Sequence, residues 1–361
     1  MARILVYTSP ARGHLYPILG PSLELAARGH DVRVLTLEAE VERVASLGLQ
    51  ASAIAPAVEA IEMDDWQEQS ARAALMRGLG VFAERAPHAH ADLRAAIATH
   101  QPDALVVDNN AWGAQTAAAA SGLPWSGFQP YLTPLPSADV PPVGLGLKPD
   151  RGVVARLRDR VLSTLMMRQM GGLALPVVNQ LRTDDGLSPL GSMVELLTLP
   201  PRTIYFTAEP FEYSRSDWPD SFVMVGPATW APPAEAPDWL DAIEPPLVLV
   251  TCSTERQADR AIIETALAGL AGEDVFVVAT SAAQDPGAFE PGPNARVEAF
   301  LPHEPFVRRA AVVVCHGGMG ITQRALSHGV PLCVVPFGRD QVEVARHVEE
   351  AGAGVRVPPR E

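Results

Sequence analysis

The chain has little lysine, little cysteine and less basic than acidic charge. Lys148 is its only lysine, and 28 lysine and arginine residues stand against 42 aspartate and glutamate residues, for a formal net charge of −14. Because a nucleic-acid footprint needs a basic face, this balance argues against a nucleic-acid partner. The cysteines lack the CxxC spacing of metal sites, and we expect them to be reduced and buried in a cytoplasmic protein; they are Cys252, Cys315 and Cys333.

Targeting segments and long apolar runs are also missing. A strand-like run at 3–8 begins almost at once, without the basic and apolar regions of a signal peptide ahead of it, and no apolar run reaches the ~18 residues of a membrane span. We therefore expect a soluble protein with no stable membrane insertion. With 361 residues, of which 47% are hydrophobic, the chain is long enough for two domains that each bury a core.

Strand-like and helix-like patterns alternate along the chain, which is typical of doubly wound parallel sheets of the α/β class. The prolines of 130–200 and the arginine-rich helical stretch at 153–170 within it indicate an insertion over one face. In the first half, the expected strands are 3–8, 31–36, 104–107, 125–128, 203–207 and 222–225, and the expected helices are 15–28, 39–47, 67–98 and 111–121.

A proline-rich segment without periodicity, 228–246, is the expected linker between a first domain at 1–227 and a second domain at 247–361. The alternation restarts after this linker. In the second domain, the expected strands are 247–252, 275–280, 296–300, 311–315 and 331–335, and the expected helices are 257–271, 304–309, 319–328 and 340–351.

The most informative segment, 316–322, reads HGGMGIT and follows the β-branched run at 311–315. This order predicts a strand, a tight loop and a helix start. Glycines let the backbone approach a ligand closely, and the free N–H groups of a helix start favour an anion such as a diphosphate. His316 adds a side-chain donor, while Asp340 and Gln341, after the next strand, suit sugar hydroxyls.

Together with 329–331 (GVP) and 336–341 (PFGRDQ), this segment resembles the nucleotide-sugar signature of the UDP-glycosyltransferase superfamily. More narrowly, it resembles the actinobacterial branch that glycosylates antibiotics and other natural products. The alternative is an ordinary βα turn followed by a surface Asp-Gln pair, which the strand-loop-helix context disfavours. The resemblance implies a GT-B fold, with two facing Rossmann-like domains and a ligand cleft between them. It also implies an acceptor-binding N-terminal domain and a C-terminal domain that binds the nucleotide sugar.

In the N-terminal half, the candidate catalytic residues are His14 and Asp108. His14 comes just after the strand 3–8, and Asp108 ends the strand 104–107. We expect the two to be neighbours, because ligands of open parallel sheets meet the carboxyl ends of the strands at the switch point. A carboxylate on one imidazole nitrogen leaves the other nitrogen free to act as a general base. The resemblance agrees, since the family's G-H-x-x-P histidine matches His14 and its orienting aspartate falls on Asp108.

A lone histidine is more often structural than catalytic, and this interpretation is kept for His88 and His90. The resemblance also extends the donor site. Phe300, in the turn 300–303 (FLPH), would stack on the nucleobase, although a core phenylalanine at a strand end is an equal alternative. The predicted donor-binding residues are Ser253, Thr254, Phe300, Leu301, His316, Gly317, Gly318, Gly320, Ile321, Asp340 and Gln341.

Arg324 departs from the family pattern. Relatives that use UDP-sugars often carry a glutamate there to accept hydrogen bonds from the ribose, which an arginine cannot do. This favours a dTDP-sugar donor. The chain also lacks the D-x-D with which the metal-dependent class of glycosyltransferases holds a divalent ion. We therefore expect neither a metal nor another cofactor.

The expected function is inverting, metal-independent transfer of a deoxysugar from a nucleoside diphosphate to a hydroxyl of an apolar natural product. The protein is expected to be a monomer or a homodimer. The sequence ends at Glu361, after a strand-like run at 353–357, whereas relatives continue through further helices, so either the sequence is shortened or these C-terminal helices are missing. The residues expected to form the acceptor walls are Met63, Trp66, Met76, Tyr131 and Met166.

Three alternatives remain open. A sterol or lipid UDP-glucosyltransferase of the same fold could touch a membrane through Arg156, Arg158, Arg160 and Arg168, although a solvated helix face explains this stretch better. A catalytically silent homologue could act as a partner protein, against which the retention of His14 and Asp108 argues. An NAD(P)-dependent enzyme is disfavoured, because 9–14 (SPARGH) replaces G-x-G-x-x-G after the first strand.

Overall fold

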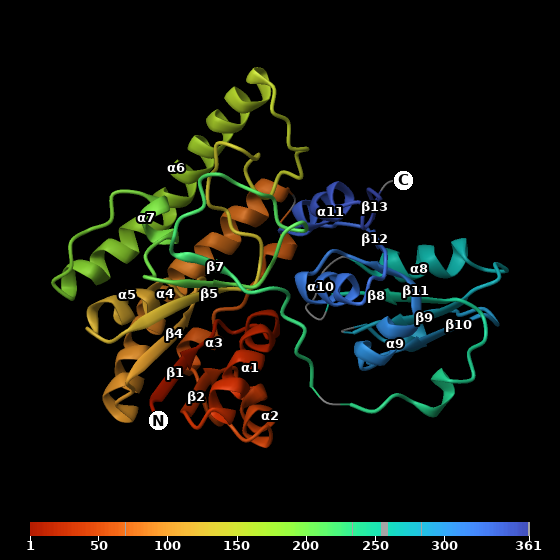
Figure 1. Cartoon of the computed structure of the whole chain (residues 1–361), viewed down its shortest axis with the longest axis horizontal. Helices are drawn as coiled ribbons and strands as arrows, with labels where there is room; N and C mark the ends of the chain where they lie inside the picture. Colours follow the sequence, from red (N-terminus) through yellow and green to blue (C-terminus); the bar gives the residue numbers. More distant parts are fainter. Residues whose placement is uncertain (69, 233, 254–258, 283, 360–361) are drawn as a thin grey trace. The chain divides into compact units, whose positions relative to one another are not determined.

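The computed structural model of the chain describes residues 1–68, 70–232, 234–253, 259–282 and 284–359. It divides into two compact units, each built around a parallel sheet (Figure 1). The first unit comprises Met1–Pro142, Pro149–Ala208 and Ser214–Trp230, and the second comprises Val143–Lys148, Glu209–Tyr213 and Ala231–Glu361. The α/β fold class expected from the sequence is confirmed in both units.

The first unit contains a seven-stranded parallel sheet of order β3-β2-β1-β4-β5-β6-β7. The strand order reverses between β1 and β4, which lie side by side with Val6 opposite Val106. The strands are β1 (Arg3–Tyr7), β2 (Asp31–Thr36), β3 (Gln50–Ala53), β4 (Ala104–Asp108), β5 (Trp125–Gln129), β6 (Thr203–Tyr205) and β7 (Phe222–Met224). The carboxyl ends of β1 and β4 therefore meet at one edge of the sheet, where ligands of such sheets bind.

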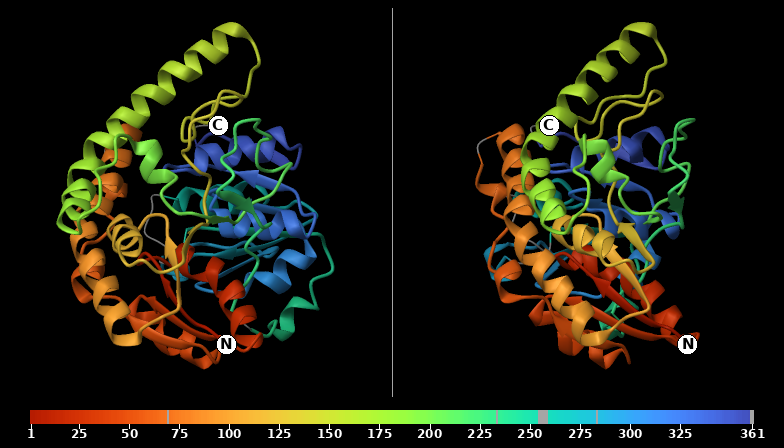
Figure 2. Two further views of the ribbon diagram at one scale, coloured as in Figure 1. Left: turned by 60° about the vertical axis from the view of Figure 1, so that its left-hand side comes forward. Right: turned by 90° about the vertical axis from the view of Figure 1, so that its left-hand side faces the viewer.

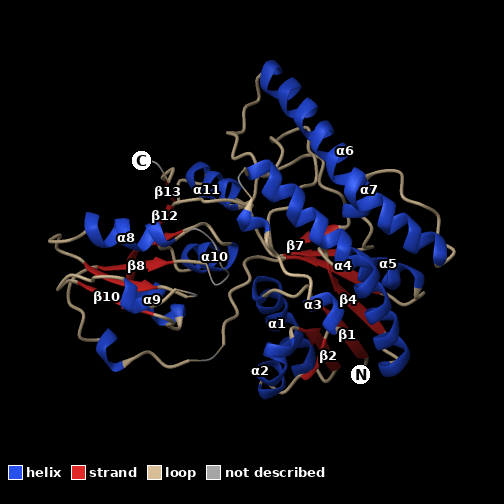
Figure 3. Ribbon diagram, turned by 180° about the vertical axis from the view of Figure 1, so that it is seen from behind, coloured by secondary structure: helices blue, strands red, loops and turns tan. Residues whose placement is uncertain are grey.

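Helices cover both faces of this sheet (Figure 3). Alternate residues of β1 enter opposite cores, as the strand period of two requires: Leu5 packs with Leu93 and Ala117, whereas Val6 packs with Leu15 and Val44. The helices are α1 (Arg12–Ala27), α2 (Val41–Ser46), α3 (Pro56–Glu59), α4 (Ala71–His100), α5 (Trp112–Ala120), α6 (Val153–Asp184) and α7 (Met193–Leu197). Short 3-10 turns at Glu38–Glu40 and Asp65–Gln67 complete the unit.

The sequence analysis missed β3, α3, α7 and the second half of α6. The strand β3 reads QASA and has no β-branched or aromatic residue to mark it. The expected helix at 153–170 continues to Asp184 through Gly171, Gly172 and Pro176, residue types that disfavour a helix interior. Packing overrides that local signal, because Ala174 and Val178 are fully buried against α4, α5 and α7.

The helix α6 also revises the expectation that no segment could span a membrane. By length and composition alone it is apolar enough to do so, with a mean hydropathy of 1.3 over 18 residues. Core helices of soluble proteins pass the same test, and 28% of this stretch is buried. The first half of α6 extends beyond the other helices of its unit (Figure 2). There it exposes Val153, Val154, Leu157, Val161 and Leu165.

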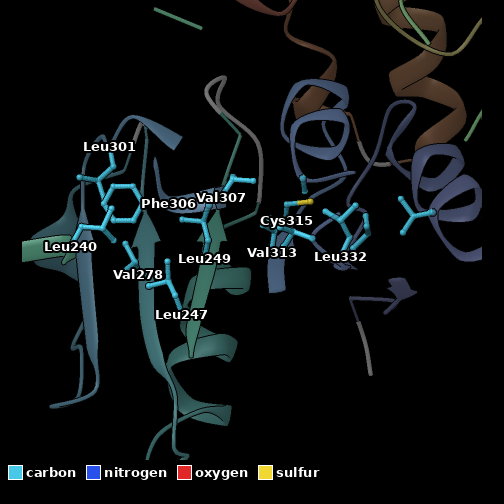
Figure 4. Packing of buried hydrophobic residues seen from close by; sticks show 14 of the residues in the cluster. Leu240, Leu247, Leu249, Val278, Leu301, Phe306, Val307, Val313, Cys315 and Leu332 are labelled. Carbon is cyan, nitrogen blue, oxygen red and sulfur yellow. The ribbon is translucent and has the colours of Figure 1, made fainter. Parts of the chain in front are cut away.

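The second unit contains a six-stranded parallel sheet of order β10-β9-β8-β11-β12-β13. The strands are β8 (Leu247–Thr251), β9 (Phe276–Thr280), β10 (Ala295–Glu298), β11 (Ala310–Cys315), β12 (Leu332–Val334) and β13 (Gly354–Arg356). The helices are α8 (Arg260–Gly269), α9 (His303–Arg309), α10 (Met319–Ser327) and α11 (Gln341–Glu350), with 3-10 turns at Asp238–Leu240 and Pro286–Ala288. Leu249 and Val313 pack with Phe306 and Val307 of α9 on one face of the sheet (Figure 4), and Val250 packs with Ile263 of α8 on the other.

Two short segments of the expected first domain, 143–148 and 209–213, belong to the second unit, where they pack on α11. Glu343 is fully buried, and its Oε2 accepts hydrogen bonds from the backbone N–H groups of Gly144 and Gly146, both at 3.0 Å. His347, also buried, donates from Nδ1 to the carbonyl oxygen of Phe211 at 2.8 Å. No motif in 143–148 or 209–213 predicted this assignment.

Candidate active site

The first candidate site lies where β1 and β4 end. Asp108 is the last residue of β4 and is fully buried, and His14 lies in the first turn of α1, with its side chain 17% exposed. The imidazole Nδ1 donates to Asp108 Oδ2 over 2.8 Å. Because a carboxylate only accepts, this bond places the proton of a neutral ring on Nδ1 and leaves Nε2 as an acceptor. The structure thus brings together the two residues that the sequence predicted to be neighbours.

The carboxylate of Asp108 is held by backbone groups as well. Its Oδ2 also accepts from the N–H of Ser9 at 3.0 Å, and its Oδ1 accepts from the N–H of Asn110 at 2.9 Å. Behind it, Gln115 donates to the carbonyl oxygens of Asp108 and Asn109 at 3.2 and 2.8 Å. The bonds from Ser9 and Asn110 satisfy the buried carboxylate and fix its orientation toward the imidazole, and those from Gln115 hold the backbone behind it.

Asn110 and Tyr131 lie on the other side of His14. The amide Nδ2 of Asn110 is 3.4 Å from His14 Nε2, and the hydroxyl of Tyr131 donates to Asn110 Oδ1. The ring of Tyr131 is 5.6 Å from the imidazole, centroid to centroid. Tyr131 was predicted as an acceptor wall, whereas Asn110 was missed. Its position two residues beyond the end of β4 could have identified it, because side chains at strand ends gather at one sheet edge.

The second candidate site is the glycine loop between β11 and α10. Gly317 has a φ of +96°, and a Cβ there would come within 2.9 Å of Val334 Cγ1. A Cβ on Gly318 would meet His316 Nε2 at 2.6 Å, whereas Gly320 faces open space. The turn therefore requires a glycine at Gly317, whereas a side chain at Gly318 would displace the His316 ring. Gly318 is the N-cap of α10 and offers no side chain to its first N–H groups.

The loop before α11 carries the predicted Asp-Gln pair. Gln341 is 2% exposed, and its Oε1 accepts from the N–H groups of Phe337 and Gly338 at 2.8 and 3.2 Å. Its side chain therefore shapes the turn that precedes α11. Asp340 is partly buried at the N-cap of this helix.

Residues 264–361 match the family described as the C-terminal domain of erythromycin biosynthesis protein CIII-like proteins. Over 373 aligned residues, the chain is 32% identical to 4'-demethylrebeccamycin synthase of Lentzea aerocolonigenes, which covers 99% of the chain and 88% of that relative. The chain belongs to the antibiotic glycosyltransferases. The resemblance inferred from the 316–341 segment is thereby confirmed, and an NAD(P)-dependent enzyme is excluded.

Solved structures of similar fold are glycosyltransferases too. The glycosyltransferase of kitacinnamycin superposes with a TM-score of 0.77 at 24% identity, covering 99% of this chain and 86% of the other. The glycosyltransferase VinC, solved in complex with dTDP, superposes with a TM-score of 0.71 at 20% identity, covering 99% and 87%. At these identities the likeness establishes the GT-B fold of this glycosyltransferase.

The remaining donor residues differ in what they offer a ligand. Phe300 is 75% exposed, so the alternative of a core phenylalanine is wrong and its ring is available for stacking. Leu301 packs in the core of the second unit, which leaves its backbone as the part that could face a ligand. The N–H of Ser253 donates to Asp259 Oδ2 at 2.6 Å, and burial raises the pKa of that carboxyl. Thr254 lies outside the described residues.

Arg324 lies on α10, 9% exposed, and forms an ion pair with Glu304 of α9, with Nη1 to Oε2 at 3.1 Å. Burial lowers the pKa of this guanidinium. The sequence analysis missed Glu304, which also contacts His328 at 2.9 Å. The arginine that replaces the family's glutamate therefore lies beside the carboxylate of Glu304. The sequence position of Arg324 alone did not indicate this neighbour.

The other predicted acceptor walls lie on two segments of the first unit. Met63 lies beside Gly78, Trp66 is 46% exposed, and Met76 packs partly against the core formed by α4, α5 and α6. Met166 is partly buried on α6. Their role as acceptor walls stays a prediction. In the part of the chain that the structure describes, no cluster of three His, Cys, Asp or Glu side chains could hold a metal ion.

Proposed function

We propose that this glycosyltransferase transfers a deoxysugar from a dTDP-sugar to a hydroxyl of an apolar natural product, with inversion at the anomeric carbon and without a metal. The observation that carries the proposal is the 2.8 Å bond from His14 Nδ1 to the buried carboxylate of Asp108. It leaves Nε2 to accept the proton of the attacking hydroxyl, and Asp108 stabilises the imidazolium that forms.

The acceptor oxygen then forms a bond to the anomeric carbon as the bond from that carbon to the diphosphate oxygen breaks. The electron pair leaves with the diphosphate, so no protein acid is needed if the new charge is stabilised. We assign this stabilisation to the first N–H groups of α10 and to His316, since the N-cap residue Gly318 has no side chain with which to cap them. The exposed ring of Phe300 would stack on the base.

The choice of dTDP rests on two supports of different weight. The structurally similar VinC was solved with dTDP. Arg324 cannot accept a hydrogen bond from a ribose hydroxyl, which disfavours UDP. This support has less weight, because the ion-pair partner of Arg324, Glu304, brings a carboxylate to the same region. A lipid acceptor is the second candidate, favoured by the exposed apolar residues of α6 described above.

Calorimetry on the full chain tests the donor assignment. We expect dTDP to bind without added Mg²⁺ and more tightly than UDP, and His316→Ala to abolish most of this binding. The matched control is His88→Ala, because His88 is exposed on α4. Loss of binding in EDTA contradicts metal independence, and a preference for UDP contradicts the choice of nucleotide.

Stereochemistry tests the base. One base facing the acceptor, with the diphosphate leaving from the opposite side, is the arrangement of a single displacement. We therefore expect an axially activated sugar to appear in an equatorial linkage, which the coupling constant of the anomeric proton reports by NMR. Retained configuration removes His14 from the proposed role. Absence of any turnover with intact dTDP binding supports instead the silent partner protein.

A further inference from the structure

The first unit holds a cavity of about 1110 Å³ that the proposed glycosyl transfer does not use. It lies along α6, and no residue of α1, α4 or α5 is among the described residues that line it. His14, Asp108 and the predicted acceptor walls are absent from its lining as well. Its volume is slightly above the roughly 300–1,000 Å³ that is typical of small-molecule sites.

Two rows of side chains on α6, each spaced by four residues, form one wall of this groove. The spacing places each row along one side of the helix. The first row is Arg156, Arg160, Thr164, Arg168 and Gly172, and the second row is Asp159, Ser163, Met167, Gly171, Leu175 and Asn179. The opposite wall comes from 136–138, from the start of α7 and from Asp217.

The groove carries unbalanced positive charge. Asp159 accepts from Arg158 at 2.8 Å, and Asp217 accepts from the hydroxyl of Ser137 and the N–H of Ala138, both at 2.7 Å. Within the described chain, by contrast, no ion pair or hydrogen bond engages the guanidinium groups of Arg160 and Arg168, which are exposed. Free cations on a chain with a net charge of −14 point to an anionic group on the ligand.

The lining of the groove also provides an apolar surface and one buried polar atom that lacks a hydrogen-bond partner among the described residues. Met167, Leu175 and Met193 contribute apolar area, and Gly172 leaves open space, since nothing lies within 4 Å of the Cβ it lacks. Ser163 is 6% exposed, and its Oγ has no hydrogen-bond partner among the described residues. A buried hydroxyl of this kind is stabilised when a ligand supplies the missing partner.

We propose that this groove is a second small-molecule site, which takes an elongated apolar ligand bearing one carboxylate or phosphate. The apolar part lies on Met167, Leu175 and Met193, and the anionic end meets Arg160 and Arg168. The ligand could be a free organic acid or the headgroup end of an anionic lipid, because both carry this chemistry. The site is independent of the proposed transfer reaction.

Fluorescence of 8-anilinonaphthalene-1-sulfonate, an apolar aromatic anion, tests the site on the full chain. We expect saturable binding that octanoate displaces and octan-1-ol does not. Gly172→Phe fills the groove and should weaken binding about 10-fold or more, since it removes the space that the ligand occupies. Its matched control is Gln180→Phe on the exposed surface of the same helix, outside the groove.

Charge is tested separately. Arg160→Gln with Arg168→Gln should weaken binding about 10-fold at low salt and less at high salt, whereas Arg72→Gln, an exposed arginine of α4, should change nothing. An unchanged far-UV circular dichroism spectrum and melting temperature show that each variant is folded. Wild-type affinity for the sulfonate probe in Gly172→Phe overturns the proposal, and so does equal displacement by octan-1-ol.

Vesicles separate the two sources of the ligand. Sedimentation of the wild type, but not of Gly172→Phe, with vesicles that contain phosphatidylglycerol identifies a lipid headgroup as the ligand. Displacement of the probe by octanoate without such sedimentation identifies a free acid. Sedimentation that Gly172→Phe leaves unchanged assigns the lipid contact to another surface, and it then overturns the lipid form of the proposal.

Discussion

The two units use the same strand arrangement to build chemically opposite sites. In each sheet the order reverses between the first strand and the fourth, that is, at β1 and β4 and at β8 and β11. At the end of β4 the chain gathers polar side chains, namely Asp108 and Asn110. At the end of β11 it places glycines, which expose backbone N–H groups instead. The candidate chemistry of the first unit therefore depends on side-chain atoms, whereas the candidate site of the second unit combines the His316 side chain with glycines that must lack one.

This difference predicts how each site fails. A side-chain site is lost when atoms are removed, while its surroundings remain. A backbone site is lost when atoms are added, because a new Cβ occupies the space or the φ angle that the loop requires. Adding a Cβ at the glycine loop should therefore impair the second unit, whereas removing side-chain atoms should impair the site at His14 and Asp108.

The largest effect should come from His14→Ala. Removing the base should lower turnover about 10²–10⁴-fold and leave dTDP binding nearly unchanged. Steady-state kinetics and calorimetry on the same preparation measure both quantities, with His88→Ala as the control. Turnover close to that of the wild type would show that the His14 and Asp108 pair is structural, and the contrast between the two units would then disappear.

Asp108→Asn should follow with a smaller loss. The amide cannot reproduce an acceptor for Ser9, Asn110 and His14 together, and losing one charge-assisted hydrogen bond of about 1.5–3 kcal/mol corresponds to about 10–150-fold in turnover. The dependence of turnover on pH distinguishes orientation from simple unfolding, because a misoriented imidazole shifts the profile. An unshifted profile together with a lowered melting temperature indicates a purely structural carboxylate.

Gly317→Ala tests the backbone site by addition. The positive φ costs a residue with a Cβ about 1–2 kcal/mol, and the contact with Val334 adds to this. We expect dTDP affinity to fall about 10-fold, in line with that strain, with turnover limited by binding. Gly320→Ala is the more discriminating variant, because its added Cβ would meet open space in the protein and alanine favours the helix. If Gly320→Ala keeps both stability and full affinity, the diphosphate does not approach the first turn of α10 closely.

The smallest effect concerns two histidines in unlike surroundings. Burial, reinforced by the charge of Arg324, lowers the pKa of His303 to about 4, whereas His14 faces a carboxylate. In the unfolded chain the imidazole of His303 has its ordinary pKa of about 6.5. Between about pH 6.5 and 4 the unfolded state therefore binds more protons than the folded state, and the free energy of unfolding falls as the pH falls. His303→Gln should therefore reduce the loss of unfolding free energy between pH 7 and 5 by about 1–2 kcal/mol. Urea unfolding at both pH values measures this, and an unchanged slope in the variant contradicts it.

The sequence predicted most of the fold where local pattern and packing agree. Central strands such as β8, in which every residue is buried, were found because their apolar runs are buried on both faces of the sheet. The strand β3 and the second half of α6 were missed because neighbours stabilise them against their own local signals. The neighbourhood of His14 and Asp108 could be predicted because strand order alone brings two strand ends together.

Other parts of the sites depend on contacts that no spacing encodes. The ion-pair partner of Arg324 is Glu304, which belongs to a different helix. The sequence shows that an arginine replaces the family's glutamate, but it does not show that another carboxylate lies beside this arginine. The fold-back of Gln341 onto its own loop depends on the turn geometry at 337–341. The groove along α6 requires knowing that the helix continues past Gly171 and Gly172.

Because 143–148 and 209–213 belong to the second unit, they affect the design of chimeras between this chain and its relatives. The chain passes from one unit to the other at 142/143, 148/149, 208/209, 213/214 and 230/231. A chimera that joins the N-terminal half of this chain to the C-terminal half of a relative would therefore pack 143–148 and 209–213 of this chain against the α11 helix of the relative. Glu343 and His347 would need equivalents that still recognise the backbone of Gly144, Gly146 and Phe211. Exchange of donor specificity between relatives should succeed when all three pieces of chain travel together.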